Sequence, residues 1–453
     1  MSAAPVSTAL YTDRYELTML GAALRDGTAQ RRCVFEVFGR RLPGGRRYGV
    51  VAGTGRLLSL IRDFQFGEDE LRFLADEKVV DAETLAFLEN YRFTGSITGY
   101  REGELYFPGS PVLVVEGTFA EAVVLETLAL SVLNHDSAIA TAAARMSVAA
   151  GERPLAEMGS RRAGEESAVA AARAAYIAGF GATSNLEAGR RWGIPTMGTA
   201  AHAWTLLHDS EEDAFRAQIA ALGVETTLLV DTYDTRTGVD TAIRVAGTEL
   251  GGVRLDSGDL PSVASAVREQ LDHLGATHTK ITVTSDLDEH AIAALAASPV
   301  DSYGVGTSVV TGAGSPTAGM VYKLVAREDP AGGWVSVAKA STNKASHGGR
   351  KSAFRTLEGG TATGELILVA SAFESLASPD APEGARPLHH ALVRSGEVIT
   401  DFEGPSGVQA ARDHHRAVRR ELPLRGLALS RSEPALPTVY VDVDMEGQPP
   451  SDS

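Results

Sequence analysis

The strongest constraint on the fold is a series of short apolar runs between residues 154 and 305, each followed by a stretch with helical spacing. The runs occupy residues 154–158, 195–197, 226–230, 252–255, 280–283 and 302–305. Alternating strands and helices are typical of a parallel sheet, and continuous apolar strands suit a sheet covered on both faces. Because about 200 residues take part, we expect a closed or partly closed α/β barrel.

The segments between these runs carry signals for helix starts. Ser210 and Asp213 resemble a capping box, and Pro261 stands where the first turn of a helix is expected. Ser285 and Asp286 precede another helical stretch, so helix capping is their expected role. The patterns at residues 30–60 and 94–118 instead predict short strands with turns, which form a small α/β layer. The pattern at 320–400 predicts hairpins that complete this layer.

Composition excludes several classes of protein. The chain has 453 residues, 44% of them hydrophobic, and a net charge of -16, which makes nucleic acid or an anionic membrane a poor partner. It has no run of 18 apolar residues and no basic, apolar N-terminal block, so we expect neither a membrane-spanning helix nor a secretory signal. The single cysteine, Cys33, fits a reducing cytoplasm.

Ligand sites of parallel barrels form at the C-terminal ends of the strands. The residues that follow the apolar runs are charged, polar or small: Arg161, Arg162, Thr199, His202, Asp231, Arg254, Asp256, Ser257, Asp259, Gly304, Gly306 and Thr307. A purely structural barrel does not need arginine and histidine there. Asp256 and Asp259 suit Mg²⁺ or ribose hydroxyls, although Asp259 also suits a helix cap.

Two further features leave their roles open. The segment GVGTSVVTGAG at 304–314 suits a phosphate loop or a structural turn equally well. It matches neither the Walker A nor the GxGxxG pattern. The histidine pairs His389–His390 and His414–His415 stand in polar surroundings, so we expect them at the surface.

Five segments, in order, resemble the nicotinate phosphoribosyltransferase family. They are TDRYELTM at 12–19, GFGATSNLEAG at 179–189, GTAAHA at 198–203, GVRLDSGD at 252–259 and GVGTSVVTG at 304–312. The resemblance implies a ligase-type glycosyltransferase of NAD biosynthesis. Such an enzyme joins nicotinate to 5-phosphoribosyl 1-diphosphate (PRPP), coupled to ATP hydrolysis, and forms nicotinate mononucleotide and diphosphate.

The resemblance also implies a fold and an assembly. The fold is an irregular α/β barrel with an N-terminal α/β sandwich domain completed by C-terminal segments. We therefore expect the sandwich and connecting helices at 1–150, the barrel with the active site at 151–320, a completing segment at 321–445 and a disordered tail at 446–453. A homodimer with sites near the subunit interface is expected, using Mg²⁺ and, as co-substrate, ATP.

Residue roles follow from the same resemblance. His202 resembles the family's phosphorylated histidine. Thr199 and Tyr15 resemble nicotinate contacts, with Tyr15 supplied by the partner subunit. Arg254 resembles a contact to the base or a phosphate, and Thr307 a contact to PRPP.

Three more positions complete the expected site. Arg161 and Arg162 match a paired arginine of the family, and Asp256 belongs to the GVRLDSGD segment. Ser184 stands where nicotinamide phosphoribosyltransferase has an aspartate, which favours nicotinate, although Ser184 also suits a helix cap. Because HGGRK at 347–351 departs from the family's pattern, no phosphate contact is expected of Lys351.

Other functions remain open at this point. Quinolinate phosphoribosyltransferase has a related fold and no ATP step, but this chain is long for it and the TAAH segment argues against it. Nicotinamide phosphoribosyltransferase is a closer alternative. A non-catalytic barrel that binds a nucleotide is the alternative from another class, and the intact TAAH, DSGD and GVGT segments argue against it.

Overall fold

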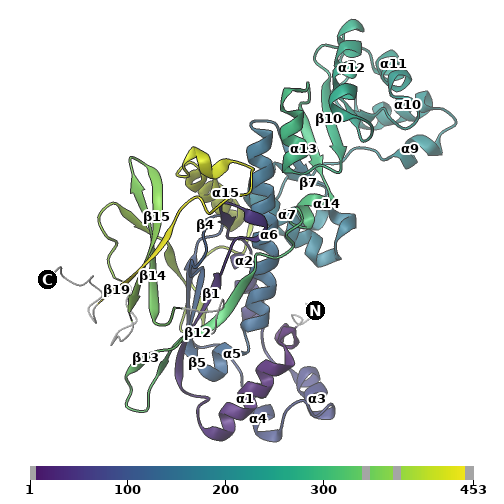
Figure 1. Ribbon diagram of the computed structural model, residues 1–453. Helices are drawn as coiled ribbons and strands as arrows, with labels where there is room; N and C mark the ends of the chain where they lie inside the picture. Colours follow the sequence, from purple (N-terminus) through teal and green to yellow (C-terminus); the bar gives the residue numbers. More distant parts are fainter. Residues whose placement is uncertain (1–6, 339–346, 371–378, 444–453) are drawn as a thin grey trace. The chain divides into compact units, whose positions relative to one another are not determined.

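The computed structural model describes residues 7–338, 347–370 and 379–443. They form two compact units (Figure 1): a sandwich unit, Met1–Ala138 with Thr317–Ser453, and a barrel unit, Ile139–Pro316. The division falls inside helix α6 (Glu126–Ala150) rather than at its end, where the sequence placed it, because Leu128 and Leu133 belong to the core of the sandwich unit. The expected tail at 446–453 lies outside the described residues.

The barrel unit is built on six parallel strands. They are β6 (Leu155–Glu157), β7 (Ala182–Thr183), β8 (Thr227–Leu229), β9 (Gly252–Leu255), β10 (Lys280–Ser285) and β11 (Ser302–Val305), in the order β7-β6-β11-β10-β9-β8. Thr196 adds a single parallel bridge to Thr183 beyond β7. The strands therefore follow one another in chain order, β11 returns to β6, and the ring is open only between Thr196 and β8. This is an irregular α/β barrel, as predicted.

Helices connect the strands in the predicted alternation. They are η3 (Ser160–Arg162), α7 (Glu165–Ile177), α8 (Leu186–Trp192), α9 (His202–Leu207), α10 (Glu211–Leu222), α11 (Thr235–Ala246), α12 (Leu260–His273), α13 (Glu289–Ala294), η4 (Leu295–Ala297) and α14 (Thr307–Val310). Helices α10, α11 and α12 pack in sequence order (Figure 1). The hydroxyl of Ser210 accepts the N–H of Asp213 at 3.1 Å, as a helix cap should.

One capping prediction is wrong. Helix α13 is capped by Asp288, whose carboxylate accepts the N–H groups of His290 and Ala291 at 2.9 and 2.8 Å. Strand β10 runs on to Ser285, two residues past its predicted end at 283, so Ser285 and Asp286 lie before the cap.

The sandwich unit holds two main sheets. The larger has the order β13-β12-β1-β5-β3-β17-β18 and the smaller β16-β14-β15-β19. The strands are β1 (Arg32–Gly39), β3 (Ser96–Tyr100), β5 (Leu113–Thr118), β12 (Met320–Glu328), β13 (Trp334–Ser336), β14 (Arg350–Glu358), β15 (Thr361–Ala370), β16 (Ala385–Pro387), β17 (His389–Arg394), β18 (Glu397–Val398) and β19 (Thr438–Val443). Because β12 pairs with β1 and β17 pairs with β3, C-terminal segments complete the N-terminal sheet, as predicted.

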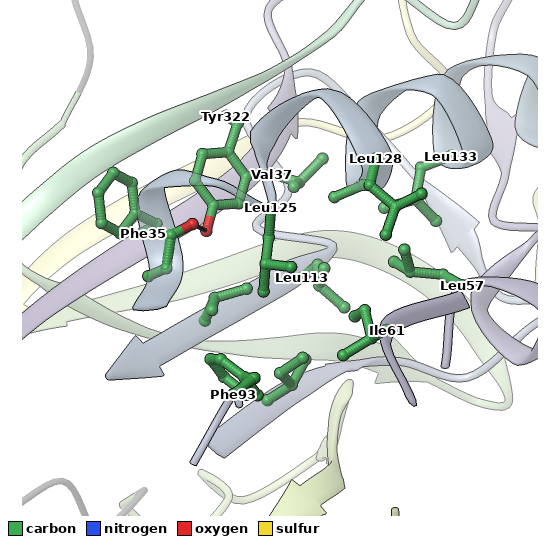
Figure 2. Close-up of a cluster of buried hydrophobic side chains, with 14 of the residues drawn as sticks. Phe35, Val37, Leu57, Ile61, Phe93, Leu113, Leu125, Leu128, Leu133 and Tyr322 are labelled. Atoms are coloured by element: carbon green, nitrogen blue, oxygen red, sulfur yellow. Dashed lines mark hydrogen bonds between the residues drawn. The ribbon is translucent and has the colours of Figure 1, made fainter. Parts of the chain in front are cut away.

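Shorter elements surround these sheets. They are η1 (Ala9–Tyr11), α1 (Arg14–Asp26), η2 (Pro43–Gly45), β2 (Gly49–Val50), α2 (Thr54–Arg62), α3 (Glu68–Asp76), α4 (Ala82–Glu89), β4 (Leu105–Tyr106), α5 (Phe119–Val123), α15 (Pro405–Arg419) and η5 (Leu424–Leu427). Figure 2 shows part of the core of the sandwich unit, where Val37 on β1 and Leu113 on β5 lie near Leu125 and Leu128.

One stretch tests the membrane prediction. The described residues contain a helical segment, Phe119–Ala150, that is long and apolar enough to cross a membrane by length and composition alone. In the structure 67% of its most apolar window is buried. Its apolar side chains thus pack inside the protein, as those of a core helix do.

The histidine pairs are buried or half-buried rather than exposed, contrary to the prediction. His415 on α15 is 2% exposed, and its Nδ1 lies 2.9 Å from the carbonyl oxygen of Gly103. His414 is bonded to Glu104 at 3.0 Å, and Nε2 of His389 lies 2.7 Å from the carbonyl oxygen of Pro111. His415 lies on the buried side of α15, whereas His414, His389 and His390 are half-buried.

Burial of His415 predicts a loss of stability in acid. Burial lowers its pKa from 6.5 to about 4, so only the unfolded chain takes up a proton there as the pH falls from 6.5 towards 4. Linkage gives a loss of about 2 kcal/mol from this residue at pH 5. Urea unfolding at pH 7 and pH 5 measures it. His415→Asn keeps a donor for Gly103 and should lose that much less stability on acidification; an equal loss in both proteins would contradict the prediction.

Candidate active site

A cavity of about 460 Å³ opens at the C-terminal ends of the barrel strands, within the barrel unit. Its size suits a small-molecule ligand. The residues that line it are Met158, Arg161, Arg162, Ser184, Gly198, Thr199, Ala200, Ala201, Arg254, Asp256, Thr284, Ser285, Asp286, Gly304, Gly306 and Thr307.

Three arginines give the cavity a local positive charge. Arg161 and Arg162 lie on η3, which follows β6, and Arg254 lies on β9. Among the residues that the structure describes, no carboxylate forms an ion pair with any of the three. In a chain with a net charge of -16, this is the concentration of positive charge that an anion site needs.

Arg254 is the most constrained of the three. One of its terminal N–H groups donates to the hydroxyl of Thr199, and its buried Nε has no partner among the described residues. Burial lowers the pKa of the guanidinium, and the neighbouring Asp256 acts in the opposite direction. A planar guanidinium with unused donors is suited to a carboxylate or phosphate ligand.

Asp256 and His202 lie close to each other at the site. Asp256 accepts the hydroxyl hydrogen of Thr284, and its backbone N–H donates to Asp231 at 2.8 Å. His202, the first residue of α9, places Nε2 3.7 Å from an oxygen of Asp256 and Nδ1 3.2 Å from the hydroxyl of Thr232. Its side chain is 40% exposed, so an attacking reagent can reach it.

Ser184, which follows β7, and Thr307, the first residue of α14, also line the cavity. Asn185, not Ser184, caps α8, because its side chain accepts the N–H of Ala188 at 2.9 Å. The alternative role of Ser184 as a helix cap is thereby excluded. Gly304 has to be glycine, since a Cβ there would lie 2.6 Å from Cγ2 of Thr284.

The structure brings together most of the predicted site residues. Those that line the cavity are Arg161, Ser184, Thr199, Arg254, Asp256 and Thr307, with Arg162 beside them. His202 lies next to the cavity through Asp256. Tyr15 lies on α1 of the sandwich unit, where its side chain is 47% exposed. Asp259 is the N-cap residue of α12 and does not line the cavity.

Sequence reasoning missed other lining residues. Thr284 follows the predicted end of its strand at 283, and the assignment of Ser285 and Asp286 to a cap removed them from the site. The signal that was available is the run KITVTS, whose β-branched residues continue through Thr284.

A cation that binds in this cavity would need ligands from the substrate as well as from the protein. The described residues contain no group of three His, Cys, Asp or Glu side chains placed to hold a metal ion. Asp256 and Asp286 do line the same cavity. Mg²⁺ commonly binds through one or two carboxylates, waters and substrate phosphates, and this donor set fits such a substrate-carried ion.

Comparison with known proteins decides the family. A nicotinate phosphoribosyltransferase of Mycobacterium tuberculosis is 57% identical over 438 residues, which cover 95% of this chain and 94% of that protein. The chain belongs to the nicotinate phosphoribosyltransferase family. A nicotinate phosphoribosyltransferase of Bacillus subtilis is 41% identical and covers 78% of this chain and 74% of its own length. The human nicotinate phosphoribosyltransferase is 33% identical, and the match covers 70% of this chain and 71% of that protein.

The family's domain model and solved structures agree. The model of the N-terminal domain of nicotinate phosphoribosyltransferase matches residues 10–134. The crystal structure of human nicotinic acid phosphoribosyltransferase has a TM-score of 0.79 at 26% identity and covers 95% of this chain and 97% of that one. The resemblance drawn from the motifs is confirmed, and the chain is an enzyme rather than a non-catalytic barrel.

Proposed function

We propose that the enzyme joins nicotinate to PRPP and releases nicotinate mononucleotide and diphosphate, a step of NAD synthesis. The observation that carries the proposal is the cavity lined by Arg161, Arg162 and Arg254, none of them ion-paired among the described residues. PRPP brings a diphosphate and a 5′-phosphate, and nicotinate brings a carboxylate. These anions supply the counter-charges that the arginines lack.

The chemistry needs charge stabilisation more than base catalysis. The pyridine nitrogen of nicotinate attacks C1 of the ribose with its own lone pair, while the C1–O bond breaks and diphosphate leaves with the bonding electrons. Positive charge develops on the ribose, as in glycoside cleavage. Arginines that neutralise the departing diphosphate then lower the barrier most. No serine–histidine–aspartate arrangement is required.

Mg²⁺ has a place in this scheme. Asp256 and Asp286 would hold the ion together with the phosphates of PRPP, and the bound ion would neutralise charge on the leaving diphosphate. One oxygen of Asp256 accepts the hydroxyl hydrogen of Thr284, and the other lies 3.7 Å from Nε2 of His202.

ATP acts through His202 in this proposal. A neutral imidazole nitrogen attacks the γ-phosphorus, the bond to the ADP oxygen breaks, and a phosphohistidine forms. The new negative charge lies beside Asp256 and changes the affinity of the neighbouring site for PRPP and diphosphate.

We propose a homodimer in which Tyr15 of one subunit contacts the nicotinate bound in the other. Tyr15 is about half-exposed, and partial burial is the main cause that raises its phenolic pKa to about 12, so the hydroxyl stays a hydrogen-bond donor. We also propose a cytoplasmic location. The one cysteine of the sequence, Cys33, is free and buried, and a chain without cysteine pairs suits a reducing compartment.

A product assay tests the proposed function. The purified enzyme receives PRPP and Mg²⁺-ATP with nicotinate, nicotinamide or quinolinate in parallel reactions, and the nucleotides are separated by chromatography. We expect nicotinate mononucleotide as the dominant product. A preference for quinolinate with release of carbon dioxide, or for nicotinamide, would replace the proposal by one of those activities.

A further inference from the structure

A buried carboxylate lies directly behind the cavity. Glu157, the last residue of β6, is 0% exposed, and it precedes the loop that carries Arg161. One of its oxygens accepts the N–H of Gly159, and the other accepts the hydroxyl hydrogen of Thr183 at 2.5 Å. No described lysine or arginine forms an ion pair with it. Glu157 is thus an anion whose partners are two neutral donors.

These bonds form part of a closed ring between two loops. The hydroxyl oxygen of Thr183 accepts the N–H of Asn185 at 3.0 Å. The side-chain amide of Asn185 donates to the hydroxyl of Ser160 at 3.0 Å, and Ser160 adjoins Gly159. The ring therefore joins the loop after β6 to the loop after β7 through Glu157.

Both loops carry site residues held by this ring. Ser184 stands between Thr183 and Asn185, and its backbone N–H donates to the carbonyl oxygen of Glu157 at 2.8 Å. Arg161 follows Ser160 in the other loop. The positions of Ser184 and Arg161 are accordingly both set by bonds that begin at Glu157.

The loop after β6 also packs against the residues that follow β11. A Cβ on Gly159 would lie 2.2 Å from Cγ1 of Val310 and 2.9 Å from the carbonyl oxygen of Gly306. Gly159, which Glu157 holds by its N–H, is therefore packed tightly against the turn that contains Thr307. If Gly159 shifted, it would press against the turn that contains Thr307.

The geometry points to Glu157 as a positioning residue that locks the loops of Arg161 and Ser184 into one arrangement. It would thereby fix the diphosphate and the pyridine base relative to each other. This inference rests on the proposed function, because it assigns these two loops to PRPP and nicotinate. A misplacement of about 1 Å at a reacting centre costs on the order of 10²-fold in rate, so such a lock has catalytic value.

The stability of the fold gives a second reason for a functional role. Burial raises the pKa of Glu157, which means that its ionised form is disfavoured in the folded protein. At neutral pH this residue costs stability, and a neutral side chain of the same shape would not carry that cost. Loss of catalysis without loss of stability is therefore the signature of positioning.

Glu157→Gln tests the inference. The amide has one acceptor oxygen, so it can accept the N–H of Gly159 but must donate its own N–H to the hydroxyl oxygen of Thr183, which reverses that bond of the ring. We expect kcat/KM for nicotinate to fall by roughly 10- to 100-fold, a weaker preference for nicotinate over nicotinamide, and an unchanged or higher melting temperature. Glu289→Gln is the matched control: this buried glutamate of the barrel unit pairs with Arg145 at 2.9 Å and does not line the cavity. It should lower the melting temperature and keep the kinetics.

Two further measurements keep the test decisive. Thr183→Val removes one donor of the ring and should reproduce part of the kinetic loss. Thr183→Ser keeps the hydroxyl and should keep the wild-type kinetics. Calorimetric titration of PRPP should show weaker binding to Glu157→Gln, and this readout holds even if the wild-type enzyme forms no nucleotide and the proposed function fails. Wild-type kinetics, selectivity and PRPP affinity in a folded Glu157→Gln enzyme would overturn the inference.

Discussion

Replacement of His202 by alanine is expected to abolish labelling of the protein by ATP that carries a labelled γ-phosphate. His202 offers a solvent-accessible imidazole at the start of α9, next to the cavity. A phosphoramidate formed on that ring is labile in acid and stable in base, which distinguishes it from a phosphoserine. We also expect loss of the stimulation of nucleotide synthesis by ATP, whereas ATP-independent synthesis persists, because glycosyl transfer does not consume the phosphate.

His208→Ala is the matched control for this experiment. His208 ends the same helix, and its Nδ1 is bonded to the carbonyl oxygen of Trp204 at 2.8 Å. It should label like the wild-type enzyme. Equal acid-labile labelling of the wild-type enzyme and His202→Ala would show that another residue takes the phosphoryl group.

Ser184→Asp should reduce the use of nicotinate by about 10²-fold. Ser184 lines the cavity with Arg161 and Arg254, where a second carboxylate would repel that of nicotinate and pair with the arginines that bind it. An aspartate accepts a hydrogen bond from the amide of nicotinamide, so the weak use of nicotinamide should persist or rise. Steady-state kinetics with each base at saturating PRPP measure both effects.

Ser184→Asn separates charge from size in this comparison. Asparagine has nearly the shape of aspartate and no charge, so it should keep most of the preference for nicotinate. If Ser184→Asp retained the wild-type turnover and affinity for nicotinate, specificity would have to come from Arg254 and backbone amides instead.

The barrel was predictable from the sequence where the strands are apolar and continuous. The runs at 252–255 and 302–305 match β9 and β11 residue for residue, because Val253, Leu255, Tyr303 and Val305 are buried in the core of the barrel unit. The run at 195–197 forms only the bridge of Thr196 to Thr183. Strand β7 has two residues and follows two glycines, so it left no apolar run to recognise.

The site was predictable in part, for similar reasons. The arginines and small residues at the strand ends predicted a ligand site, because few other roles suit such residues there. Ser285 and Asp286 were assigned to a cap that belongs to Asp288, because the strand was expected to end at 283, two residues before β10 ends. Glu157 gave no signal, because an acidic residue at a strand end reads as exposed. Only the structure shows that Gly159 and Thr183 bury it.

The central claim is that this arginine-lined cavity carries out the displacement of diphosphate by nicotinate. Phosphorus NMR of the purified enzyme with nicotinate, PRPP and Mg²⁺-ATP tests it most directly, with the wild type compared with the double variant Arg161→Met/Arg254→Met. We predict that the wild type releases diphosphate and nicotinate mononucleotide in equal amounts, and that the folded double variant releases neither at a measurable rate. Wild-type rates of both products in that variant would contradict the account.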